Sequence, residues 1–206
     1  LAAIPFVIVG HPSMKAKTLR EVIAEAKADP SKLSIGHGGN GTAMHLSAAL
    51  LGQMAGAKFT DVPYRGSGPA ALDALGGQIP LAIVDLPSAL QQIKAGKVKV
   101  YGVTSKTRVA SLPDVPTMSE AGFKGFEVGI WHGMWAPKGT PKPIINKLNA
   151  ALNDALNDED LKKKFADLGT APEPVERRKP DVLRAFLPAE IAKWGPIIKK
   201  AGVYAD

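Results

Sequence analysis

The first strong hydrophobic pattern in the chain is that of a helix beginning near residue 19. Apolar side chains recur at the i, i+3, i+4 and i+7 spacing of one helix face, and they are Leu19, Val22, Ile23 and Ala26. Thr18 and Glu21 precede the first full turn in the S/T-x-x-E order of a capping box. Asp29-Pro30 follows, and proline disfavours helical backbone in the residue before it, so we expect the helix to end there.

Short apolar strands then alternate with helices over the next 80 residues or so. The expected strands are residues 33–35, 59–62, 81–84 and 99–103, and the expected helices are residues 43–54, 69–75 and 88–94. Strands that alternate with helices of this length are typical of a parallel α/β sheet with helices on both faces. Ligands of such sheets bind beyond the carboxyl ends of the strands, where the helix N-termini point.

The pattern changes near residue 127, which we take as a boundary. An extended apolar segment covers residues 126–136, and beyond it a long amphipathic helix is marked by Ile144, Ile145, Leu148, Ala151, Leu152 and Ala155. Residues 4–9 also have the pattern of a strand, so these two flanking segments should pair with each other or with something outside the chain. The sequence predicts no second sheet that the helices of residues 127–206, which we call the tail, could cover. Within them, Pro188 and the Gly195-Pro196 pair predict a kink or a break.

The composition narrows the class of protein without identifying it. The 206 residues are 45% hydrophobic and 22% charged, which is enough to bury a core, and they contain no cysteine, which excludes thiol catalysis, disulfides and thiolate metal sites. The net charge of +7 favours anionic partners. Because the basic residues are scattered, with no aromatic residues between them, we interpret them as solvated helix faces and expect no nucleic-acid partner.

Nothing in the chain predicts a membrane anchor. No run of 18 or more apolar residues occurs, and residues 1–10 lack the basic segment of a signal peptide. A mature secreted chain, a cytosolic protein and a truncated chain all fit this observation.

The most informative motif is Gly38-Gly39-Asn40-Gly41-Thr42, which lies at an expected strand-to-helix turn. A helix N-terminus carries unpaired N–H groups and about half a positive charge, so a glycine-rich approach lets an anion bind the backbone itself. The alternative is a tight turn that needs glycines at positive φ. No Lys-Ser or Lys-Thr pair follows, which excludes a nucleoside triphosphate loop, and the dinucleotide spacing also fails.

Polar side chains follow the next two strands at the same end of the sheet. Tyr64 and Arg65 lie in the turn after residues 59–62, where the guanidinium could meet a carboxylate or pair with a local acid. Asp85 ends the third strand, where it orders a loop, caps a helix or binds a ligand.

The sequence predicts neither a metal site nor a catalytic centre. The histidines show no H-x-x-x-H or H-E-x-x-H spacing, and they are His11, His37, His45 and His132. There is no G-x-S-x-G motif and no convincing Ser-His-acid order. We therefore expect no cofactor and no enzyme activity. Trp131 is interpreted either as a core residue or as the wall of a ligand cleft.

Taken together, these motifs resemble the tripartite tricarboxylate transporter receptors, the Bug proteins. The resemblance covers nearly the whole chain and rests on an ordered set of segments, namely residues 34–46, 62–66, 76–78, 86–88, 102–105, 112–117, 136–141 and 190–194. It implies a periplasmic-binding-protein-like (type II) α/β fold with a parallel-rich sheet flanked by helices, plus C-terminal helices of an incomplete second lobe. The implied parts are a crossover strand of lobe one at residues 1–11, the ligand-binding lobe two at residues 12–126, and the return strand and C-terminal helices of lobe one at residues 127–206.

The resemblance also implies a function and a set of binding residues. It implies a periplasmic receptor that binds a small organic acid without catalysis and delivers it to membrane permease subunits. The expected ligand-binding residues are His37, Gly38, Gly39, Asn40, Gly41, Thr42, Tyr64, Arg65, Asp85 and Trp131. Typical receptors have a further N-terminal part of lobe one before the position of Leu1, so we expect exposed apolar surface on the tail, or a dimer or domain swap that hides it. The alternatives are the effector-binding domain of a transcription regulator and an enzyme on a similar fold.

Overall fold

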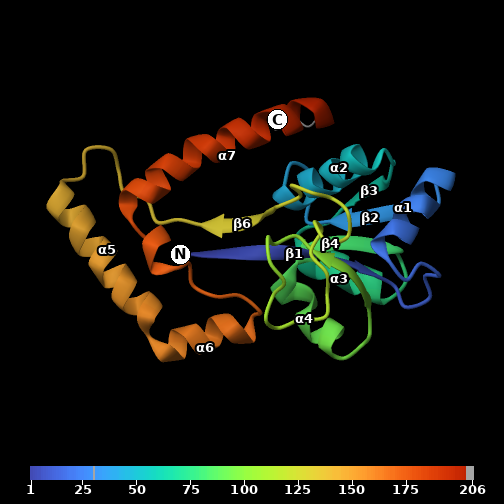
Figure 1. The fold of residues 1–206 in the computed structure, drawn as a ribbon, viewed down its shortest axis with the longest axis horizontal. Coiled ribbons are helices and arrows are strands. Elements are labelled where there is room, and N and C mark those ends of the chain that lie inside the picture. The colour runs from blue at the N-terminus through green and yellow to red at the C-terminus, as the bar shows by residue number, and fades with distance from the viewer. Residues whose placement is uncertain (30, 203–206) are drawn as a thin grey trace.

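A six-stranded mixed sheet forms the centre of the structure (Figure 1). The computed structural model describes residues 1–29 and 31–202. Five strands follow the order β3-β2-β4-β1-β5, and β6 pairs with the first half of β1 outside this path. The strands are β1 (Ala2–Gly10), β2 (Ser34–His37), β3 (Thr60–Pro63), β4 (Leu81–Asp85), β5 (Lys99–Val103) and β6 (Gly129–His132).

Helices follow β1 to β4 in the predicted alternation, and further helices make up the tail. They are α1 (Leu19–Ala28), α2 (Ala43–Ala55), α3 (Ser67–Leu75), α4 (Leu86–Lys94), α5 (Lys142–Asn157), α6 (Glu159–Asp167), the 3₁₀ turn η1 (Val175–Arg177) and α7 (Pro180–Ala201). The predicted start of α1 is confirmed, because Thr18 Oγ1 accepts the Glu21 N–H at 3.3 Å. Asp29 is the C-cap of α1, and Pro30 lies outside the described residues. Among the described helices none is long and apolar enough to cross a membrane.

The predicted parallel pairing is found among β2, β3 and β4, while β1, which the sequence placed outside this unit, is inserted antiparallel beside β4 and β5. β2 pairs in parallel with β3 and with β4, as the alternation predicts. β1, however, runs antiparallel between β4 and β5, so that Val7 faces Val84 on one side and Val103 on the other. The reason is that β1 enters this sheet from the tail side, where its first residues pair with β6, and not from a preceding helix of the α/β unit.

The core lies on both faces of β1. Phe6 and Ile8 point to one face, where they are fully buried with side chains of α1 and α2. Val7 and Val9 point to the other face and pack with side chains of α3 and α4. Full burial of a large apolar side chain contributes roughly 2 kcal/mol to stability, so this strand anchors two cores at once.

The tail is packed far less tightly than the α/β unit. β6 pairs antiparallel with the first half of β1. The expected strands at residues 4–9 and 126–136 therefore pair with each other, which was one of the two predicted possibilities. Within the described part of α5, α6 and α7, Leu156 is the one buried residue. Large apolar side chains are exposed on the tail, which confirms the expected apolar surface, and they are Met134, Trp135, Ile144, Leu148, Leu168, Val175, Val182 and Ile191. Residues 203–206, the end of the expected tail, lie outside the described residues.

The break expected at the prolines of the last helix does not occur. α7 continues as one 22-residue helix through both Pro188 and Pro196, and it runs back toward α2 (Figure 1). Proline removes one N–H from a helix, which leaves the carbonyl four residues earlier without its helical donor. Because α7 has no buried residue among those described, water can satisfy that carbonyl, and the helix persists.

Candidate functional site

The turns that follow β2 and β3 lie against each other at one end of the sheet. Because β2 is parallel to both β3 and β4, the carboxyl ends of these three strands meet at the same edge. Tyr64 N–H donates to His37 O at 2.9 Å, and Gly66 N–H donates to Gly38 O at 3.1 Å. The structure therefore brings together the two turns that the sequence assigned to this edge.

The glycine turn is closed by its own hydrogen bonds. Gly39 has a φ of +126° and Gly41 a φ of +74°, values that L side chains rarely adopt. Gly39 N–H lies 3.3 Å from His37 Nδ1, Gly41 N–H donates to His45 Nδ1 at 3.1 Å, and Thr42 N–H donates to Gly39 O at 3.3 Å. The Gly41 and Thr42 amides are therefore not open to a ligand, as a simple cradle would require, and the Gly39 amide is engaged in the tautomer in which His37 Nδ1 accepts. Thr42 Oγ1 is likewise engaged, since it donates to Gly39 O and accepts the His45 N–H as N-cap of α2.

Other amides of the same edge remain without internal partners. Among the described residues, none accepts a hydrogen bond from the N–H groups of Asn40, Ala43 and Met44, at the start of α2. The same is true of the N–H groups of Ser67 and Gly68, which begin α3. The first turn of a helix leaves such donors exposed and carries partial positive charge. The N–H groups without internal partners thus lie at two adjacent helix N-termini.

The expected side chains divide into engaged and free groups. Tyr64 Oη donates to Asp73 Oδ2 at 2.7 Å, and burial together with this hydrogen bond raises the pKa of Tyr64 to about 12. Asp85 Oδ1 accepts the Ser88 N–H at 2.9 Å and so caps α4, one of the roles considered from the sequence. Arg65 is exposed and makes no hydrogen bond or ion pair with any described residue. Arg65 is thus the available charged group at this edge.

Trp131 does not join the two turns. It lies on β6 with its ring edge-on to Phe186 of α7, 5.1 Å between centroids. It lines a separate cavity of about 880 Å³ between β1, β6, the connection after β5 and α7. None of the other expected binding residues lines this cavity, which we call the tail cavity. The placement of Trp131 in the ligand cleft is therefore not supported by its position.

The structure also assembles a group that sequence spacing missed. His37 at the end of β2 is stacked on His45 of α2, with ring centroids 4.5 Å apart and planes 10° apart. His37 Nε2 lies 4.0 Å from Asp61 Oδ1 on β3. Burial lowers the pKa of His37, the neighbouring His45 lowers it further, and Asp61 opposes the change. The group could have been found only by predicting that β2 pairs with β3, because this pairing brings Asp61 close to His37.

Comparison with known proteins reveals relatives along the whole chain. A family described as "Tripartite tricarboxylate transporter family receptor" matches residues 1–203. A protein of Agrobacterium vitis from the TAR-I ttuE-ttuC' intergenic region is 40% identical over 98% of this chain, and Protein BugT of Bordetella pertussis is 34% identical over 97%. This chain spans 58% and 60% of the length of those two relatives.

Solved structures show the same fold. The periplasmic binding protein BugD has a TM-score of 0.85 at 39% identity, covering 100% of this chain and 68% of that one. MatC from Rhodopseudomonas palustris, solved with bound malate, has a TM-score of 0.85 at 34% identity over 96% of this chain and 67% of that one. An R. palustris protein solved with adipate has a TM-score of 0.86 at 31% identity over 98% and 67%.

Proposed function

Because this chain belongs to the tripartite tricarboxylate transporter receptor family, we propose that it is the ligand-binding part of a periplasmic solute receptor for a small organic carboxylate. Relatives of the same fold were solved with malate and adipate, which supports a dicarboxylate as the ligand. The receptor binds the acid without chemical change and presents it to membrane permease subunits. The family match favours this proposal over the two alternatives, a regulator's effector domain and an enzyme, because the family is one of transporter receptors.

The same proposal assigns each part of the chain to one of two lobes. Residues 12–126 are the ligand-binding lobe, residues 1–11 the crossover strand, and residues 127–206 the return strand and the helices of the other lobe. The concentration of both core clusters between residues 6 and 128 supports this division. The low burial of α5 to α7 supports it as well, since helices that cover a second sheet would bury one face there.

One carboxylate group of the ligand binds between the N-termini of α2 and α3. The observation that carries this proposal is the set of unpartnered N–H groups there, which belong to Asn40, Ala43, Met44, Ser67 and Gly68. Arg65 adds a positive charge, and hydrogen bonds between an ionised group and its partner are about twice as strong as neutral ones. Gly38 to Thr42, His37, Tyr64 and Asp85 then shape the site by fixing the turns, while Trp131 lies in the tail cavity.

The proposal is tested by titrating the ¹⁵N-labelled chain with malate, adipate and citrate and following backbone amide shifts. We expect saturable shifts at Asn40, Ala43, Met44, Ser67 and Gly68. The affinity should be weak, on the order of millimolar, because a single lobe supplies only some of the donors that closure brings together. Arg65→Gln should weaken binding about tenfold, since a hydrogen bond to a charged group contributes about 1.5 kcal/mol or more.

Arg184→Gln is the matched control. Arg184 is an exposed arginine of α7, paired with Asp181 far along the chain from the turns, and its loss should leave the affinity unchanged. The ligand should be recovered unaltered after prolonged incubation, since the proposal assigns no catalysis. Shifts confined to the tail cavity, or equal losses in both arginine variants, would contradict the proposed site.

A further inference from the structure

His37, His45 and Asp61 place three metal-ligating side chains around one small volume. One potential ligand atom from each of them lies within 4.8 Å of those of the other two. The three residues come from β2, from the first turn of α2 and from β3. These elements are fixed by the parallel pairing of β2 with β3 and by the helix that follows β2, so the backbone of the group is set by the fold.

His37 has an unexplained polar atom at the centre of this group. Its side chain is fully buried, yet Nε2 has no hydrogen-bond partner among the described residues. Leaving a buried polar atom unpaired costs about 1 to 3 kcal/mol, so such atoms call for a partner outside the chain. The nearest charged group is the Asp61 carboxylate, 4.0 Å away and too far for a hydrogen bond.

The other ring nitrogen of His37 is placed as in metal sites. Nδ1 lies 3.2 Å from Gly39 O and 3.3 Å from Gly39 N. In the tautomer in which Nδ1 donates to the carbonyl, Nε2 carries the free lone pair and the Gly39 N–H has no acceptor, so metal binding selects this tautomer. Ligating histidines usually donate their second N–H to a carbonyl or carboxylate, which fixes the ring.

We propose that His37, His45 and Asp61 form a binding site for a divalent transition-metal ion of the zinc class. Two imidazoles and a carboxylate suit zinc, which binds such nitrogen and oxygen ligands at about 2.0 to 2.2 Å and accepts water as a fourth ligand. The set does not suit magnesium or calcium, which prefer oxygen ligands. The metal site shares His37 with the turn that shapes the proposed carboxylate site, but its test is separate, because zinc binding is measured without an organic acid.

Metal binding requires a local rearrangement that has a defined signature. Ligand atoms bound to one tetrahedral zinc lie roughly 3.3 Å apart, so the group must contract, and the parallel imidazole rings must turn for their lone pairs to converge. The Asp61 side chain is 46% exposed and free to move. A neutral imidazole has one lone pair, so once the metal takes that of His45, the Gly41 N–H loses its acceptor.

The test is titration of the chain with zinc at neutral pH, followed by calorimetry and by ¹H–¹⁵N spectra. We expect one zinc per chain and a large shift of the Gly41 amide, with no such response to magnesium or calcium. Asp61→Asn and His45→Gln should weaken zinc binding about tenfold or more, the loss seen even for outer-shell partners of a metal. These two residues are not fully buried, so the variants should fold, which circular dichroism checks.

His132→Gln and His11→Gln are the matched controls, because both histidines lie away from the group and their loss should leave zinc binding unchanged. The proposal is overturned if wild type binds no zinc. It is overturned equally if Asp61→Asn binds zinc as tightly as wild type, or if binding depends on His11 or His132 instead.

Discussion

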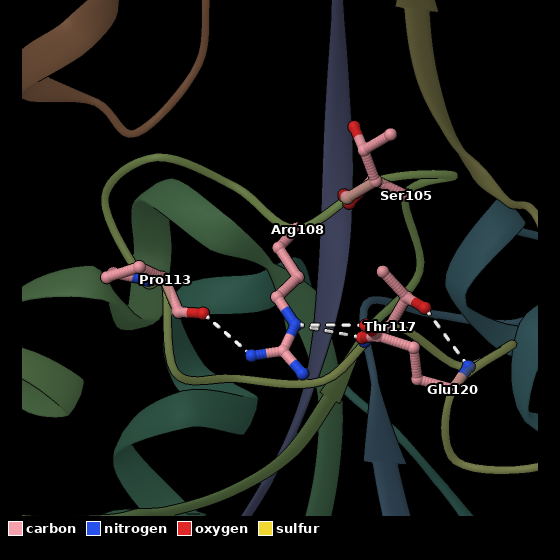
Figure 2. A network of polar contacts seen from close by, with 6 residues as sticks. Ser105, Arg108, Pro113, Thr117 and Glu120 are labelled. Carbon is pink, nitrogen blue, oxygen red and sulfur yellow. Dashed lines mark hydrogen bonds and ion pairs between the residues drawn. The ribbon is translucent and has the colours of Figure 1, made fainter.

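Arg108 and Glu120 link separate parts of the long connection between β5 and β6 to one another (Figure 2). Arg108 Nε contacts both carboxylate oxygens of Glu120, at 3.0 and 3.1 Å, and Arg108 Nη1 donates to Pro113 O at 2.9 Å. Glu120 also accepts the Thr117 N–H at 2.7 Å, while Thr117 Oγ1 accepts the Glu120 N–H at 3.1 Å. An exposed ion pair alone contributes little to stability. Here, however, the same carboxylate both binds Arg108 and accepts the Thr117 N–H, which closes the turn at residues 117–120.

This arrangement predicts a pH-dependent contribution to stability. The hydrogen bond from Arg108 and that from the Thr117 N–H lower the pKa of Glu120 below its ordinary value of 4.5. A carboxyl group whose pKa is lower in the folded state stabilises the fold fully above about 4.5, and this is lost as the pH falls through the lowered value. We therefore expect Glu120→Gln to be less stable than wild type at neutral pH, with the difference disappearing in acid. Urea unfolding at several pH values measures this difference in the free energy of unfolding. Glu176 is an exposed glutamate, and the difference between Glu176→Gln and wild type should not change with pH in this way.

At the same scale, the sequence predicted the need for glycine but not the partners of the glycines. The sequence left open an anion-binding turn or a tight turn with glycines at positive φ, and Gly39 and Gly41 both have positive φ. That two imidazole rings would lie against these glycines depends on ring orientation and on the tilt of α2, which no local pattern encodes. Asp61 reaches the same place only through strand pairing, so spacing rules for metal sites had nothing to detect.

At the scale of elements, periodicity located every strand and helix of the α/β unit to within a few residues. Helix α3 begins at Ser67 and α4 at Leu86, each two residues before the expected start. Pro69 and Pro87 therefore lie inside the first turns of these helices, where proline is tolerated. The direction of β1 was not predictable in the same way. An isolated run of apolar residues fixes a strand, but whether it runs parallel or antiparallel depends on the path by which the chain enters the sheet.

The prolines of α7 give a prediction at this scale. Pro188 lies in the middle of a continuous helix, where proline costs up to about 3 kcal/mol relative to alanine. Pro188→Ala should therefore raise the helix content of the tail and its resistance to unfolding, as followed by far-UV circular dichroism during thermal melting. Pro180 stands in the first turn of the same helix, where proline is well tolerated, so Pro180→Ala should bring no gain. A less stable Pro188→Ala chain would show that the proline supports a contact of the tail instead.

At the scale of the whole molecule, stability is distributed unevenly. Both hydrophobic clusters lie in the α/β unit, and β1 passes through the middle of both. The tail is attached through β6, through the contact of α7 with α2, and through Lys193 Nζ, which donates to Glu127 O at 2.6 Å. Local opening is easiest where few apolar side chains are buried, so the tail should open before the sheet does.

The exposed apolar side chains of the tail predict association between chains. Ile191 on α7 is 65% exposed and Leu148 on α5 is 45% exposed, and other large apolar side chains of the tail are exposed as well. Exposed apolar surface drives self-association and binds hydrophobic dyes where it is contiguous. We expect the molar mass from light scattering to rise with concentration, and the Ile191→Lys/Leu148→Lys variant to lower both this rise and dye binding without loss of helix content. Leu72 on α3 is 60% exposed but isolated from the tail, so Leu72→Lys should change neither measurement. A wild-type chain that stays monomeric and binds no dye would show that the tail residues shield one another in solution.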